Sequence, residues 1–218
     1  MQVGGHHLII DTPPDFRDQV LTFGVSRVDA VFITHTHADH IFGFDDLRRF
    51  CYMQKMVIPV YGSPETLASM RQKFSYVIEE SIWRASAPRV GFIELTAPVA
   101  VGEAEIEPVT VPHGPMDVYG YVIRHQGRSF GYIPDCSRVD DAVVERLQGL
   151  DVMVLDALRI KPHPTHLCLA ESLDALQRIR AKTSYLTHLC HDLEHEETQR
   201  QLPDRIYVAY DGLVLNVD

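Results

Sequence analysis

Residues 32–43 read FITHTHADHIFG, and this stretch decides the fold. Four side chains that commonly bind metals, His35, His37, Asp39 and His40, fall within six positions. The preceding run, residues 28–33, is rich in β-branched and aromatic side chains, which predicts a buried strand. The stretch therefore indicates a metal site at the edge of a sheet, where imidazole and carboxylate donors suit zinc, iron and manganese.

The spacing of these donors indicates two pairs. His35 and His37 are two residues apart, so an extended backbone points both side chains the same way. Asp39 and His40 are adjacent and therefore diverge from that pair. One segment can thus serve two ions, one through each pair. The alternative is a polar loop with solvated histidines.

The histidine-rich segment and the residues that follow it resemble a known family. Residues 34–40, followed by GFDDLR at 43–48, resemble the metallo-β-lactamase superfamily. More narrowly they resemble the branch that contains the phosphodiesterase of the carbon–phosphorus lyase pathway, a relative of ribonuclease Z. The resemblance runs from about Ile9 to the C-terminus. It implies a four-layer αββα sandwich and a single metallo-hydrolase domain over residues 1–218.

The composition of the chain restricts its expected compartment and partners. Hydrophobic residues make up 45% of the chain, yet no apolar run approaches the ~20 residues of a membrane span. The four cysteines are scattered and form no CxxC pair, and residues 1–15 do not resemble a signal peptide, so we expect a reduced, cytoplasmic protein. A net charge of −10 disfavours a broad nucleic-acid surface. We expect a small-molecule partner and no membrane, with a homodimer as a candidate assembly.

The hydrophobic pattern predicts strands and helices that do not follow the regular period of a Rossmann or barrel fold. Two sheets packed face to face, with helices outside, are a consistent layered solution. Asp211-Gly212 predicts a hairpin between residues 206–210 and 213–217. Tyr76, Ile82 and Trp83 are assigned either to the core or to a pocket. The predicted strands are 6–10, 28–33, 57–61, 90–95, 105–111, 118–124, 129–133, 152–155 and 184–187, and the predicted helices are 15–24, 44–53, 64–74, 140–147, 169–181 and 193–202.

Three more candidate ligands follow predicted strands: His113, Asp135 and His188. Judged alone, a histidine after a strand is more often a surface residue than a ligand. Asp135 could equally cap the helix that begins near Asp140. In the family that the chain resembles, these are the positions of the later metal ligands, in this order.

The resemblance implies a centre with two divalent ions, zinc or manganese, with iron as an alternative. Such a centre lowers the pKa of a bridging water, which becomes the nucleophile near neutral pH. Asp39 then belongs to the catalytic set as well as to the ligands. The implied assignment gives one ion His35, His37 and His113, gives the other Asp39, His40 and His188, and makes Asp135 the bridge.

Other residues are expected to support the chemistry. Asp11 ends a strand and could orient a ligand histidine, as such sites usually require; the alternative is a turn carboxylate before a proline. By resemblance, His166 is the general acid for the leaving alkoxide. Arg48, Arg159 and Lys161 are candidate phosphate contacts, with solvated surface cations as the alternative.

His191 lies where the resembled phosphodiesterase has a ligand of a separate structural zinc. The partner cysteines of that zinc come from an N-terminal Cys-rich loop, which this sequence does not contain. Either the structural zinc is absent, or the chain begins at an internal methionine and lacks an N-terminal strand and that loop. Without partner cysteines, His191 belongs to a polar helix start.

The expected function is hydrolysis by a binuclear metal-dependent phosphodiesterase that acts on a small or cyclic phosphate ester. The run Asp45-Asp46-Leu47-Arg48 favours this branch. The same kind of site can attack a carbonyl, so a lactonase or thioesterase is the alternative. A non-catalytic accessory protein of a biosynthetic pathway is a second alternative.

Overall fold

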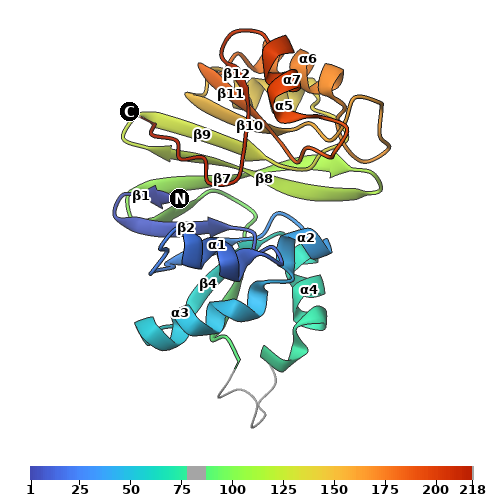
Figure 1. Cartoon of the computed structure of the whole chain (residues 1–218). Coiled ribbons are helices and arrows are strands. Elements are labelled where there is room, and N and C mark those ends of the chain that lie inside the picture. The colour runs from blue at the N-terminus through green and yellow to red at the C-terminus, as the bar shows by residue number, and fades with distance from the viewer. Residues whose placement is uncertain (78–86, 218) are drawn as a thin grey trace. The chain divides into compact units, whose positions relative to one another are not determined.

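The computed structural model describes residues 1–77 and 87–217, so the expectation for Ile82 and Trp83 lies outside the described residues. The chain divides into two compact units, Met1–Ala104 (unit 1) and Glu105–Asp218 (unit 2). Both sheets and the helices around them are visible in Figure 1. Within the described residues, no helix is long and apolar enough to cross a membrane.

Unit 1 contains a five-stranded sheet in the order β1-β2-β3-β4-β5. β1 is antiparallel to β2, and the other pairs are parallel. Parallel strands end at the same edge of a sheet, so Asp11 after β2 and the histidine loop after β3 are brought together. The strands are β1 (Gln2–Val3), β2 (His6–Ile10), β3 (Ala30–Phe32), β4 (Ile58–Gly62) and β5 (Val90–Glu94).

The helices of unit 1 pack their apolar side chains against the sheet. Val31 and Ile33 pack with Phe44, Leu47 and Leu67 in one buried cluster. The hydroxyl of Ser63 caps α4 by accepting a hydrogen bond from the Thr66 N–H at 3.1 Å. The helices are α1 (Phe16–Thr22), α2 (Ala38–Ile41), α3 (Leu47–Gln54) and α4 (Pro64–Lys73), with 3₁₀ turns η1 (Phe44–Asp46) and η2 (Ser75–Val77).

The second sheet has seven strands in the order β12-β11-β10-β9-β8-β7-β6. β7, β8 and β9 are antiparallel neighbours, whereas β9, β10, β11 and β12 are parallel. The strands are β6 (Val99–Val101), β7 (Ala104–His113), β8 (Met116–His125), β9 (Arg128–Ile133), β10 (Val152–Asp156), β11 (Thr183–Thr187) and β12 (Ile206–Val208).

Three helices of unit 2 are α5 (Asp141–Leu147), α6 (Leu169–Ile179) and α7 (His195–Gln201). Leu147 of α5 and Ile179 of α6 pack against Met153 and Leu155 of β10, so these helices cover one face of the sheet. Each unit thus consists of a sheet with helices. The mixed α/β fold with two sheets that the resemblance predicts is confirmed.

The predicted C-terminal hairpin is wrong. Asp211 and Gly212 do form a turn, in which the Leu213 N–H bonds the Tyr210 carbonyl at 3.0 Å. β12, however, pairs in parallel with β11, and residues 213–217 form no strand. Parallel pairing buries Ile206 and Val208, and this burial decides the partner of β12 instead of the local turn signal.

Candidate metal centre

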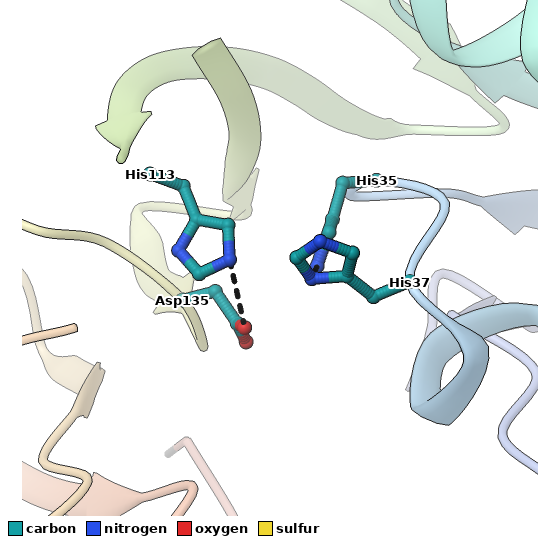
Figure 2. A group of neighbouring side chains, drawn as sticks. All are labelled: His35, His37, His113 and Asp135. Atoms are coloured by element: carbon teal, nitrogen blue, oxygen red, sulfur yellow. Dashed lines mark hydrogen bonds and ion pairs between the residues drawn. The ribbon is translucent and has the colours of Figure 1, made fainter. Parts of the chain in front are cut away.

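The loop after β3 brings two imidazole nitrogens together. Nε2 of His35 lies 2.9 Å from Nδ1 of His37. Figure 2 shows the two rings close to each other on the same loop. Two ligands on a tetrahedral zinc ion are about 3.3 Å apart, given zinc–nitrogen bonds of about 2 Å. The spacing therefore suits a shared ion, as the sequence predicts.

His40 is the third histidine of this loop, and Asp11 holds it in place. Oδ2 of Asp11 lies 2.8 Å from Nδ1 of His40, and the same carboxylate accepts bonds from the Thr34 N–H and hydroxyl. This contact fixes the ring, and Nε2 of His40 faces Asp39. Asp11 thus contacts a histidine of the HTHADH segment, and its role as an orienting residue stays a prediction.

Asp11 is itself in an unusual environment. Burial raises the pKa of its carboxyl group, while the bonds from His40 and Thr34 oppose that rise. Its φ of 59° is in the left-handed region, and so is that of His188, at 62°. Such conformations are uncommon outside glycine and cluster at functional sites.

Asp39 lies on α2, beside His40. Its Oδ2 is 3.5 Å from Nε2 of His40, and its side chain is 62% exposed. His35 and His40 are buried, whereas His37 is exposed. His37 and Asp39 therefore reach solvent, whereas His35 and His40 are enclosed.

Asp135 is the centre of the second cluster, in unit 2. Its Oδ2 lies 3.8 Å from Nε2 of His113, 3.9 Å from Nδ1 of His166 and 3.6 Å from Nε2 of His188. These separations are too long for hydrogen bonds and approach the spacing of two ligands on one ion. Figure 2 marks the contact between Asp135 and His113. A buried carboxylate surrounded by imidazoles fits a divalent cation.

His113 is the last residue of β7, and the backbone carbonyl of Thr165 orients its ring. Its Nδ1 lies 2.7 Å from the carbonyl oxygen of Thr165, so Nε2 is the nitrogen directed at Asp135. Gly114 follows with φ of 61°, and a Cβ there would lie only 2.6 Å from Thr165 Cγ2. Only glycine lets the Thr165 loop approach His113 this closely.

The alternative role for Asp135, as a helix cap, is excluded. α5 already has a cap: Oδ1 of Asp140 accepts a bond from the Val143 N–H at 3.0 Å. Asp135 instead follows β9, and its oxygen faces the three histidines.

His166 is oriented by a residue that the sequence reasoning missed. Nδ1 of His166 lies 3.0 Å from Oδ2 of Asp156, which also accepts bonds from the N–H groups of Cys136 and Leu167. Burial raises the pKa of Asp156, and the bond from His166 opposes that rise. His166 in turn stacks on His188, with ring centroids 4.8 Å apart. Asp156 thus holds His166 much as Asp11 holds His40.

Asp156 could have been found from the sequence. The predicted strand stopped at Leu155, whereas β10 continues to Asp156. The signal was a carboxylate at the end of an apolar strand, which is the same signal that identified Asp135.

The remaining candidates make local contacts. Arg48 lies 3.3 Å from Asp45, and Arg159 donates to backbone carbonyls of its own loop. Lys161 is exposed. Their contact with phosphate stays a prediction. His191 is 94% exposed and lies 3.6 Å from Asp192.

Comparison with known proteins shows the family. The model of the beta-lactamase superfamily domain matches residues 6–189, so the chain belongs to this family. The superfamily consists of metal-dependent hydrolases. The resemblance found from the histidine loop is confirmed.

Solved structures agree. A crystal structure of a diphosphatase from the PhnP family is 40% identical, with a TM-score of 0.90 over 100% of this chain and 82% of that chain. Two more distant structures share the fold. Zn²⁺-bound PqqB from Methylobacterium extorquens is 20% identical, with a TM-score of 0.79 over 98% of this chain and 84% of its own. Human tRNase Z, short form, is 19% identical, with a TM-score of 0.75 over 100% and 91%.

Two curated relatives carry different activities. An octanoyltransferase of Porphyromonas gingivalis is 31% identical over 98% of this chain, which spans only 43% of that protein. The exodeoxyribonuclease YycJ of Bacillus anthracis is 24% identical over 81% of this chain and 69% of its own length. The chain therefore corresponds to less than half of the octanoyltransferase.

Proposed function

We propose that this protein is a binuclear metal-dependent phosphodiesterase that hydrolyses a small or cyclic phosphate ester. The observation that carries the proposal is Asp135, whose buried oxygen faces three imidazole nitrogens at 3.6–3.9 Å. The likeness to a PhnP-family diphosphatase at 40% identity supports chemistry at phosphorus. Four free cysteines suit a reducing compartment such as the cytoplasm.

The donors of both units would act together. Each ion would be zinc or manganese, with iron as the alternative. Two such ions acidify a water molecule and stabilise negative charge on the oxygens around phosphorus. The proposed assignment is His35, His37 and His113 for one ion, Asp39, His40 and His188 for the other, and Asp135 for both.

Other residues of the chain would orient the ligands, protonate the leaving group and offset the charge of the phosphate. Asp11 and the Thr165 carbonyl hold His40 and His113 in one ring orientation, which lowers the cost of ordering the ligands. Asp156 holds Nδ1 of His166, so the proton on Nε2 of His166 can pass to the leaving alkoxide. Arg48, Arg159 and Lys161 would offset the charge of the phosphate.

A second candidate function is hydrolysis of a carbonyl compound, as in a lactonase or thioesterase. The octanoyltransferase relative favours it, because that likeness extends over 98% of this chain. The substrate class would then be an octanoyl ester or thioester, attacked at carbon by the same site.

One experiment separates these functions. The protein is stripped of metal, reloaded with manganese or zinc, and assayed with bis(p-nitrophenyl) phosphate and with an octanoyl thioester. We expect about two ions per chain and turnover of the phosphodiester alone. His37→Ala should abolish that turnover, whereas the matched control His191→Ala, at a 94% exposed histidine, should not.

Each other outcome overturns the proposal. Two ions with turnover of the thioester alone would establish the second candidate. Two ions with neither activity, or no bound metal, would favour the accessory role. Full activity of His37→Ala would refute the metal mechanism.

A further inference from the structure

Three tyrosines lie close together at the β12 edge of the second sheet. Tyr185 and Tyr207 are register partners on β11 and β12, and their rings are 5.5 Å apart at 32°. Tyr207 is 43% exposed and Tyr210 is 59% exposed. We call Tyr185, Tyr207 and Tyr210 the tyrosine platform. Its strand neighbours Leu186 and Ile206 point the other way, into the core beneath the helices.

The three phenols share one environment. Burial raises the pKa of Tyr185, and the nearby Tyr207 and Tyr210 raise it further. The ring of Tyr210 also meets His195 edge-on, with centroids 5.9 Å apart. Tyr210, which lies beyond the end of β12, is therefore close to Tyr185 and to His195, the first residue of α7.

The face of β11 that carries Tyr185 also carries residues next to the candidate metal ligands. Thr187 is two residues after Tyr185, so it lies on the same face of β11. Its register partner is Asp156, which holds His166, and His166 stacks on His188. Thr187 ends β11 about 7 Å beyond Tyr185 along the strand, and His188 is the next residue.

We propose that the tyrosine platform stacks on the base of a nucleoside whose phosphate ester is hydrolysed at the metal centre. Each base has two flat π faces, so aromatic side chains can stack on a base whatever its identity. A nucleoside phosphate carries its base and its phosphate at separate ends of one sugar, as the platform and the ligands are separated along β11. The net charge of −10 favours a single nucleoside unit over a long strand. This inference rests on the proposed phosphodiesterase function.

The test uses two esters with the same leaving group. One is thymidine 5′-(p-nitrophenyl phosphate), and the other is methyl p-nitrophenyl phosphate, which lacks the nucleoside. Stacking of one base is worth about 5-fold to 150-fold in affinity. We expect Tyr207→Ala to raise KM for the thymidine ester by at least about 5-fold and to leave the methyl ester unaffected. Tyr207→Phe should keep the wild-type KM.

Tyr52→Ala is the matched control, because Tyr52 is a 74% exposed tyrosine of unit 1. A binding assay without turnover complements the kinetics: anisotropy of 1,N⁶-ethenoadenosine monophosphate on the metal-loaded protein. Tyr207→Ala should weaken this binding by at least about 5-fold, and Tyr52→Ala should not.

The outcomes separate the two ideas. If Tyr207→Ala and wild type hydrolyse both esters alike and bind the probe alike, the platform proposal is wrong and the phosphodiesterase stands. If neither ester is hydrolysed but Tyr207→Ala weakens probe binding, the phosphodiesterase proposal is wrong and the platform stands as a nucleotide site.

Discussion

The two units obtain their candidate ligands in different ways. In unit 1, four donors come from six consecutive positions of one loop, and a single carboxylate, Asp11, holds one of them. In unit 2, the donors His113, Asp135, His166 and His188 are spread over 76 positions and meet because separate strands and loops bring them together. The first cluster is local in sequence, and the second is a product of sheet topology.

Topology explains why the dispersed donors meet. β9, β10 and β11 are parallel neighbours, so their carboxyl ends lie at one edge of the sheet. Asp135 follows β9, Asp156 ends β10 and His188 follows β11. Three adjacent strand ends thus supply an acid, an acid and a histidine. Ligand sites at the carboxyl ends of parallel strands are a general feature of α/β sheets.

The largest expected effect concerns Asp135, which faces three histidines. Mutation of a residue that only orients a metal ligand typically reduces activity by up to ~100-fold. Asp135→Ala should reduce turnover by more than this, because it removes the proposed shared ligand itself. His37→Ala removes a ligand of one ion, so metal analysis should find about one ion left. Metal content and phosphodiester turnover are measured together, with the exposed Asp204→Ala as the control. Two bound ions in Asp135→Ala would contradict the assignment.

His166 should matter only when the leaving group needs a proton. His166→Ala should slow hydrolysis of an alkyl phosphodiester by about 100-fold to 10,000-fold, the usual range for general acid catalysis. A p-nitrophenyl ester, whose leaving group is stable as an anion, should be hydrolysed nearly as fast as by wild type. Equal losses with both esters would indicate that His166 is a metal ligand instead.

The two orienting carboxylates allow a direct comparison of the units. Asp11→Asn should weaken metal binding about 10-fold to 100-fold, because His40 is a proposed ligand. Asp156→Asn should mainly slow the alkyl ester and leave metal affinity close to wild type, because its partner is the proposed acid. Metal titration and leaving-group kinetics of both variants test this difference. Identical profiles would show that the two carboxylates do not have distinct roles.

The smallest effect is expected far from the ligands. The hydrogen bond from Lys182 lowers the pKa of Asp151 from 3.8 to about 2 in the folded protein. Because the folded pKa is the lower one, this contribution to stability is present above about pH 4 and is lost as the pH falls toward about 2. Ion pairs at the protein surface contribute about 0.2–1 kcal/mol. Urea unfolding should show Lys182→Met destabilised near neutral pH, with a smaller difference near pH 3; an unchanged difference would contradict this.

Sequence reasoning was strongest where the determinants are local. The HTHADH loop, the Ser63 cap of α4 and most strands could be predicted because neighbouring residues set them. Asp156 was missed because the predicted strand ended one residue early, at Leu155, whereas β10 continues to Asp156, which pairs with Thr187 of β11. The hairpin after Tyr210 was wrong for a related reason, since burial of β12 beside β11 outweighed the turn signal.

We propose that the local cluster and the dispersed cluster together hold one pair of ions. Electron paramagnetic resonance of the full chain reloaded with Mn²⁺ tests it most directly, because two ions that share a carboxylate are magnetically coupled. The account predicts about two ions per chain with the spectrum of a coupled pair, and loss of the coupling in Asp135→Ala. Two ions with the spectrum of isolated Mn²⁺, or coupling that persists in Asp135→Ala, would contradict it.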